Sequence, residues 1–303
     1  MNPSDTKFVS VFGGKGGVGK SLLTILLADY LSSAEVKTQG QENRKFKVLV
    51  LDMDDQCSAA CHLLGEERVS IMGQKKLSLP DVLPKMSSVD SLYDWLPPVI
   101  NCREAQHSNS SRIKTLGRVD VIHSFNSNRI NNFLTNSSAA QSRTIAKNLR
   151  QYFSDNYDIV LIDLPSSNMP NDYSLIGMFL AENFFVPTSC SALEVLSFPR
   201  TFELLENLKI QKGDDFAHTI HGLVFNMVDK RSKTWKKRKN EIESIARDYN
   251  LNKTYSIHFN FNHSLMNASL YDGVSLKAKF ATVSEKTRLL AIKMLFDLGL
   301  KLQ

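Results

Sequence analysis

The stretch from Val9 to Leu23 constrains the fold of this chain more than any other part of the sequence. An apolar segment that predicts a strand runs into a glycine-rich loop, and the loop runs into a segment that predicts a helix. Residues 14–21 match the phosphate-loop pattern G-x-x-x-x-G-K-[ST]. Glycine has no Cβ atom, so the backbone N–H groups of such a loop can close around an anion. The pattern predicts a nucleotide-phosphate site, and the strand-to-helix context disfavours the alternative of a glycine-rich turn that binds nothing.

Each part of this loop has an expected role. Lys20 is expected to reach the β- and γ-phosphates, Ser21 to bind Mg²⁺, and the start of the following helix to attract anions. ATP and Mg²⁺ are therefore the predicted cofactors. The predicted nucleotide-binding residues of the loop are Gly14, Gly16, Gly17, Val18, Gly19, Lys20, Ser21 and Leu22.

The rest of the chain alternates between the two kinds of element. Short apolar runs predict strands at 46–51, 119–123, 158–163, 183–187, 220–226 and 255–259. Helical patterns fall at 21–34, 140–153, 173–181, 194–209, 234–249 and 285–300. This alternation predicts an α/β fold, a doubly wound and mostly parallel sheet of the P-loop NTPase type. We expect a single domain over 1–303, with an irregular insertion of short helices and loops at about 66–118.

Acidic side chains end two of the predicted strands. Asp163 follows an apolar run, as a Walker B acid does when it holds Mg²⁺ through water, and Asp52 and Asp54 end another. The carboxyl ends of parallel strands are where ligands bind in open α/β sheets, so these acids are expected beside the phosphate loop. The alternatives are a structural acid at Asp163 and an aspartate-rich turn at 52–55.

Lys15 lies inside Gly-Lys-Gly-Gly-Val-Gly-Lys-Ser, which resembles the deviant Walker A motif of the ParA/MinD family of dimerising ATPases. The resemblance implies that Lys15 crosses a dimer interface to the nucleotide of the second copy, a role that spacing alone does not show. The family's Asp-x-Asp-Pro-Gln motif matches Asp52, Asp54 and Gln56, with Asp55 in place of proline. This match implies that Asp54 positions the attacking water and that Asp52 assists by contacting the metal or a lysine.

Two further positions follow from this resemblance. The family usually has two consecutive prolines shortly after the Walker B acid, whereas this chain has Pro165 followed by Ser166. The strand at 220–226 resembles the family strand whose asparagine reads the adenine edge, which implies that role for Asn226. A cap or turn former is the alternative for Asn226.

The net positive charge of the chain is concentrated in one short segment. Residues 230–239 carry seven basic side chains, more than the whole net charge of +6. Like charges at this density favour a polyanionic partner over a solvated face, and phosphate contact is the natural candidate. The predicted DNA-binding residues are Lys230, Arg231, Lys233, Lys236, Lys237, Arg238 and Lys239. A supplementary group comprises Lys277, Lys279, Lys286 and Arg288.

Composition excludes several classes of protein. The cysteines, Cys57, Cys61, Cys102 and Cys190, lack C-x-x-C spacing, so neither a disulfide framework nor a zinc site is indicated. Cys57, Cys61 and His62 could share a helix face as metal ligands, but buried thiols are favoured. No apolar run reaches the ~18 residues of a membrane span, and no signal peptide is evident. We expect a cytoplasmic protein.

These features together predict a ParA-type partition ATPase. The resemblance implies an ATP-bound homodimer, non-specific binding to nucleoid DNA, and a centromere-binding or cargo adaptor protein that stimulates slow hydrolysis. Few residues precede the phosphate loop, so no N-terminal helix-turn-helix extension is expected. The alternatives are a MinD-like membrane ATPase, for which the run at 289–296 lacks a basic polar face, and ParA-like positioning of a protein assembly. A metal or cluster carrier would need paired cysteines.

Overall fold

The structure is a computed structural model of the chain. It describes residues 6–36, 44–75, 77–83, 100–101, 119–125, 139–166, 172–228, 232–251, 253–260 and 281–300. Lys230, Arg231, Lys277 and Lys279, which the sequence predicts to bind DNA, lie outside the described residues. So do most positions of the insertion at 66–118.

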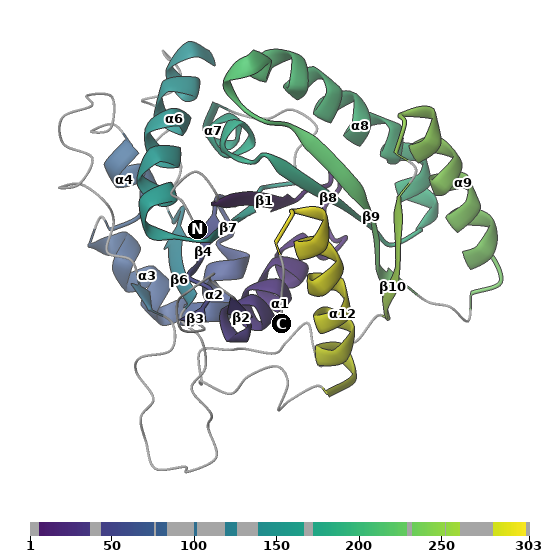
Figure 1. Cartoon of the computed structure of the whole chain (residues 1–303), viewed down its shortest axis with the longest axis horizontal. Coiled ribbons are helices and arrows are strands. Elements are labelled where there is room, and N and C mark those ends of the chain that lie inside the picture. Colours follow the sequence, from purple (N-terminus) through teal and green to yellow (C-terminus); the bar gives the residue numbers. More distant parts are fainter. Residues whose placement is uncertain are drawn as a thin grey trace.

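A single large sheet organises the fold, in the order β10-β9-β8-β1-β7-β4-β6-β5 (Figure 1). Every neighbouring pair is parallel except β5 and β6. The strands are β1 (Lys7–Val11), β4 (Val48–Asp52), β5 (Ile100–Asn101), β6 (Val119–His123), β7 (Ile159–Asp163), β8 (Asn183–Thr188), β9 (Thr219–Val228) and β10 (Thr254–Asn260). The mostly parallel, doubly wound P-loop fold that the sequence predicts is confirmed.

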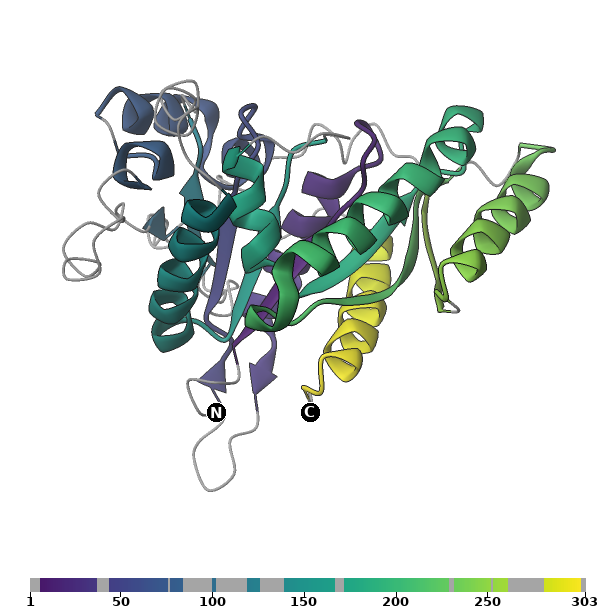
Figure 2. The ribbon, with the colours of Figure 1, turned by 90° about the horizontal axis from the view of Figure 1, so that it is seen from above.

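Helices cover both faces of the sheet, as Figures 1 and 2 show. One face carries α6 (Ala139–Asn156), α7 (Asp172–Leu180), α8 (Ala192–Lys212) and α9 (Trp235–Asp248). The other carries α1 (Lys20–Ser33), α2 (Ser58–Leu64), α3 (Glu66–Gln74) and α12 (Ala281–Asp297). Strand β4 shows why both layers form: Leu49 and Leu51 pack into the first core, and Val48 and Val50 into the second. A strand buried on both faces reads as a continuous apolar run, as this one does.

The structure adds three elements that periodicity did not predict. Two short strands, β2 (Glu35–Val36) and β3 (Arg44–Lys45), pair antiparallel after α1, where the sequence predicts only a polar linker. Within the insertion, α3 and the single turn α4 (Leu79–Val82) agree with the predicted short helices. Strand β5 extends the sheet antiparallel to β6. A two-residue strand is too short to show any period, so only pairing reveals it.

The fold brings the predicted site together at one edge. β1 lies between β7 and β8, and β7 lies beside β4. In the register of β4 and β7, Asp52 is directly opposite Asp163. The phosphate loop leaves the end of β1 at the same edge, so the loop and both strand-end acids are neighbours. No helix in the described ranges has the length and apolar content needed to cross a bilayer.

Candidate functional site

The phosphate loop connects β1 to α1 and uses backbone conformations that require glycine. Gly17 has φ 77° and Gly19 has φ 78°, both in the left-handed region that side chains rarely adopt. Gly19 is the N-cap of α1, so Lys20 and Ser21 are the first residues of the helix. The loop is also braced from α8, because the N–H of Gly14 donates to Thr201 Oγ1 at 3.2 Å. This preformed loop at a helix N-terminus is suited to an anion.

Lys20 is almost fully buried behind the loop. Its Nζ donates to the carbonyl of Lys15 at 3.3 Å and contacts the hydroxyl of Ser166. Burial lowers the pKa of Lys20, and the carboxylates of Asp163, Asp54 and Glu194 oppose that shift. The buried ammonium thus lies against the loop, and its predicted role on the β- and γ-phosphates stays a prediction.

Asp163 is a buried carboxylate that lies beside Ser21 without a hydrogen bond of standard geometry. It has no exposed surface, and neither oxygen accepts a hydrogen bond of standard geometry. Burial raises its pKa to about 6, while the nearby Ser21 hydroxyl and Lys20 ammonium lower it and Asp54 raises it. A buried, unpaired carboxylate costs free energy unless a cation satisfies it. Together with the adjacent Ser21 hydroxyl, this oxygen donor set fits a magnesium ion that accompanies a nucleotide.

Asp52 and Asp54 have different surroundings. Asp52 is fully buried, and its two oxygens accept the backbone N–H groups of Asp54 at 3.1 Å and Ala60 at 2.8 Å. Burial and the neighbouring Asp163 raise the pKa of Asp52 well above its usual range. Asp54 is half-buried, and its Oδ1 accepts the N–H of Gln56 at 3.0 Å. Asp52 therefore holds the loop that carries Asp54, and its role on a metal or lysine stays a prediction.

Lys15 is held within its own chain. Its Nζ donates to Ser191 Oγ at 3.1 Å, and Ser191 is the N-cap of α8, which also accepts the N–H of Glu194. Glu194 is buried and accepts the N–H and hydroxyl of Ser189. The described chain thus docks Lys15 on the start of α8, and its role across a dimer stays a prediction.

Asn226 is buried beneath the phosphate loop. Its Nδ2 donates to the carbonyl of Val18 at 2.9 Å and to that of Gly19 at 3.3 Å. A Cβ atom on Gly19 would lie 2.2 Å from this nitrogen, so the asparagine and the glycine require each other. Both amide hydrogens are used, which leaves Oδ1 as the group that could meet an adenine amino group. The adenine role stays a prediction, and the observed role is to support the loop.

Replacing Asn226 with alanine should destabilise the protein by about 1–3 kcal/mol, because the carbonyls of Val18 and Gly19 would lose a buried donor. Denaturant unfolding without nucleotide measures this effect. Asn156→Ala is the matched control, since that exposed amide donates only to the carbonyl of Tyr152 within its own helix. Equal stability of the two variants would contradict the supporting role of Asn226.

The predicted DNA-binding residues at the start of α9 divide into two groups. Lys236 and Lys237 are exposed, as is Lys233 just before the helix, whereas Arg238 and Lys239 are half-buried. Lys239 is 31% exposed; its Nζ lies 3.2 Å from Glu243 and 5.6 Å from the centre of the Phe225 ring. Lys239 therefore packs against β9, which the charge run by itself did not reveal. Arg288, from the supplementary group, pairs with Glu285 at 2.8 Å.

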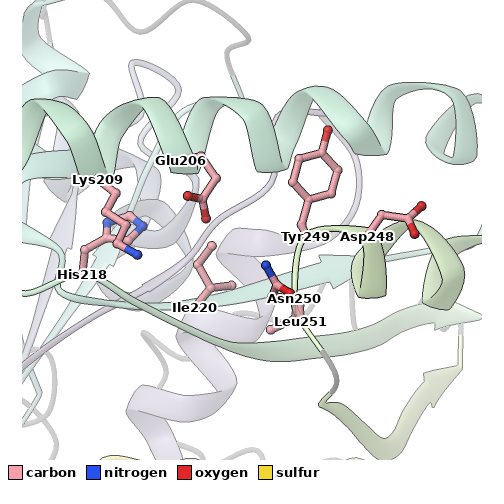
Figure 3. A pocket seen from close by; sticks show the side chains of 8 residues that line it. All are labelled: Glu206, Lys209, His218, Ile220, Asp248, Tyr249, Asn250 and Leu251. Atoms are coloured by element: carbon pink, nitrogen blue, oxygen red, sulfur yellow. The ribbon is translucent and has the colours of Figure 1, made fainter.

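A hollow lies elsewhere on the described chain. About 410 Å³ in volume, it is lined by Glu206 and Lys209 of α8, by His218 and Ile220, and by the end of α9 (Figure 3). Because β9 begins at Thr219, this hollow is at the amino edge of the sheet, opposite the phosphate loop. Burial, aided by Lys212 and Lys209, lowers the pKa of His218 to about 3, so its ring is neutral. The hollow is not part of the nucleotide site.

No cluster of metal ligands built from histidine, cysteine and acidic side chains occurs in the described ranges. Cys57 is buried and Cys61 half-buried on α2, and burial raises the pKa of both thiols. This agrees with the prediction that they are ordinary packed thiols.

Four supporting side chains were not predicted from the sequence in these roles: Thr201, Ser166, Ser191 and Glu194. They reach the loop from β7, β8 and α8, at separations of up to 187 residues along the chain. No local pattern marks them. The departure from the family at Ser166 was the single visible signal.

Comparison with known proteins gives the family of the chain. Residues 6–216 match the family described as AAA domain, which spans more than half of the chain and includes the loop, Asp54 and Asp163. Among curated proteins, the chromosome-partitioning ATPase Soj of Treponema pallidum (strain Nichols) is 28% identical over 223 residues, 72% of this chain and 70% of that protein.

Solved structures show the same fold. Apo McdA of Cyanothece superposes with a TM-score of 0.68 at 18% identity, covering 96% of this chain and 99% of that one. The ParA of pNOB8, bound to nonspecific DNA, superposes with a TM-score of 0.61 at 17% identity, covering 97% and 98%. The family match shows that the chain belongs to the AAA domain family. With its deviant phosphate loop, its strand-end acids and its match to Soj, the chain is an ATPase of the ParA/MinD deviant Walker A type.

Proposed function

We propose that the chain is a partition ATPase that binds DNA without sequence preference and positions a DNA cargo, a plasmid or a chromosome, through an ATP-dependent dimer. One observation carries the proposal. The buried Lys20 ammonium, the buried Asp163 carboxylate and the glycine loop meet at the carboxyl edge of the neighbouring strands β1 and β7. The relatives support the partition and DNA-binding parts of the proposal, since Soj is a chromosome-partitioning ATPase and the pNOB8 ParA binds nonspecific DNA.

The chain's own residues divide the work at this edge. Lys20 and the loop N–H groups bind the phosphates, Ser21 and Asp163 hold the metal, and Asp54 orients a water molecule. Bound Mg²⁺ neutralises negative charge on the phosphates. Positioning and charge cancellation are most of what phosphoryl transfer needs. Lys15 leaves Ser191 and reaches the second copy, and an adaptor protein on the cargo speeds hydrolysis.

The first turn of α9 supports the DNA surface. Helix α9 begins at Trp235 with no acidic residue in its first turn, and Lys236 and Lys237 are exposed there. The N-terminus of a helix carries a partial positive charge, so each lysine at this place costs about 0.3–1 kcal/mol. A bound phosphate removes that cost. Because α9 follows the carboxyl end of β9, this surface lies on the same edge of the sheet as the nucleotide loop (Figure 2).

Salt titration of DNA binding tests the proposal. The triple variant Lys233→Ala, Lys236→Ala, Lys237→Ala should bind duplex DNA more weakly. Its log–log salt slope should be flatter by about 0.9 for each phosphate that the variant no longer neutralises. Random and cargo-derived DNA should bind alike, because phosphate contacts carry no sequence information. ATP should strengthen binding of the wild type, because a dimer presents the surface twice.

The control is Lys239→Ala, which removes one positive charge from α9 and is compared with the loss per lysine in the triple variant. Because Lys239 is occupied by Glu243 and Phe225, its removal should leave the salt slope near that of the wild type. If the triple variant keeps the full slope and affinity, the DNA surface lies on another part of the molecule.

A further inference from the structure

Ser166 lies directly against the phosphate loop. It follows the end of β7 by three residues and is exposed. Its hydroxyl contacts the Nζ of Lys20. A Cβ atom built on Gly16 would be 3.7 Å from both the Cβ and the Oγ of Ser166, so the serine lies close to the loop as well as to its lysine. The hydrogen bond to Lys20 and this proximity place the hydroxyl beside the loop.

The hydroxyl takes up a donor that a nucleotide needs. An ammonium group has three N–H donors, and two of those of Lys20 go to the Lys15 carbonyl and the Ser166 hydroxyl. Burial disfavours the charged form of Lys20. Each acceptor offsets part of this cost by accepting a hydrogen bond from the ammonium group. The third donor can take one phosphate oxygen, and a second phosphate oxygen that binds Lys20 must displace an acceptor already present. Ser166 is the one that can leave without unfolding the loop, because it belongs to another segment.

This arrangement depends on a departure from the pattern of the family that the chain resembles. Members of the ParA/MinD family usually carry proline where Ser166 stands, and proline has neither a hydroxyl nor an N–H to offer. The segment that holds Ser166 begins at Asp163, the residue assigned to the metal. The contact between Ser166 and Lys20 thus links the end of β7 to whether the loop holds a nucleotide.

We propose that Ser166 is a positioning residue that competes with the nucleotide for the Lys20 ammonium and so weakens the binding of ATP and ADP alike. This rests on the proposed nucleotide site. In the nucleotide-free protein the hydroxyl holds Lys20 against the loop. In the occupied protein the phosphates take its place and Ser166 is released.

Three substitutions at Ser166 separate the hydroxyl from the stiffness of the backbone. Ser166→Ala removes the hydroxyl and leaves the freedom of the backbone nearly unchanged, whereas Ser166→Pro removes the hydroxyl and stiffens the chain. Both should bind ADP and a non-hydrolysable ATP analogue about fivefold more tightly than the wild type, the effect of removing one modest hydrogen bond from the free state. Ser166→Thr keeps the hydroxyl and should restore affinity to near the wild-type value.

Titration calorimetry with each nucleotide gives these affinities without any measurement of turnover. Ser33→Ala is the matched control, because it removes an exposed hydroxyl that bonds only to the carbonyl of Asp29 in α1. Thermal unfolding of every variant checks that the fold is kept.

The outcomes distinguish the competition from the nucleotide site on which it rests. Tighter binding of both nucleotides by the alanine and proline variants, with rescue by threonine, supports the competition. Unchanged affinity, or opposite effects of alanine and proline, overturns it. Weaker binding of the ATP analogue alone also overturns it, since Ser166 would then contact the third phosphate. If the wild type itself binds neither nucleotide, the proposed function fails, and this inference fails with it.

Discussion

Lys20→Ala is expected to reduce the affinity for ATP by at least about a hundredfold, which is about 2.7 kcal/mol. The ammonium is buried behind the loop, and charged hydrogen bonds to phosphate each contribute about 1.5–3 kcal/mol. The Nζ of Lys20 lies between the Lys15 carbonyl and the Ser166 hydroxyl, and no other lysine or arginine among the described residues contacts both groups. No other side chain therefore supplies a positive charge at this position when Lys20 is removed. Calorimetry with ATP and Mg²⁺ measures the reduction.

Lys15→Ala is the informative comparison for this result. It removes a lysine from the same loop, but one whose Nζ points to Ser191 at the start of α8. This variant should still bind ATP while sedimenting as a monomer, because the proposed target of Lys15 lies on the second copy. ATP affinity of Lys20→Ala within twofold of the wild type would refute the assignment of the phosphate site. An intact ATP-bound dimer of Lys15→Ala would refute the role of Lys15.

Asp54→Ala is expected to abolish hydrolysis, with a rate reduction of about a hundredfold or more, while ATP binding is retained. Asp54 is the half-buried acid beside Lys20, and it stands on a loop that Asp52 fixes through the N–H groups of Asp54 and Ala60. Binding of the phosphates is served by the loop and Lys20, and orientation of the water by Asp54. Because one set of groups binds the phosphates and another orients the water, we expect the variant to accumulate as the ATP-bound dimer.

Phosphate release under single-turnover conditions, together with sedimentation in ATP, measures both effects. Asp55→Ala is the matched control, because it removes the adjacent carboxylate, which is exposed. The control should retain hydrolysis. Wild-type turnover in Asp54→Ala would move the catalytic role to Asp52 or to another group.

Local patterns in the sequence determined the layout of the site. The glycine spacing, Lys20 and Ser21 follow from a short motif whose backbone conformations only glycine adopts freely, and Gly17 and Gly19 adopt them. The strand-end acids Asp52 and Asp163 were predictable because a buried parallel strand is an apolar run that stops where water and ligands begin. The alternation of such runs with helical patterns determined the fold class.

Only the tertiary structure decided which side chains support the site and which basic residues face outward. Thr201, Asn226, Ser191 and Ser166 come from segments remote in the sequence, and no periodicity connects them to residues 14–21. Lys237 and Lys239 are alike in a charge run, yet their side chains are 79% and 31% exposed because Lys239 turns toward Phe225 and Lys237 does not. Contacts of this kind arise when the helices pack on the sheet. Because packing brings together residues that are distant in the sequence, a pattern along the chain does not predict these contacts.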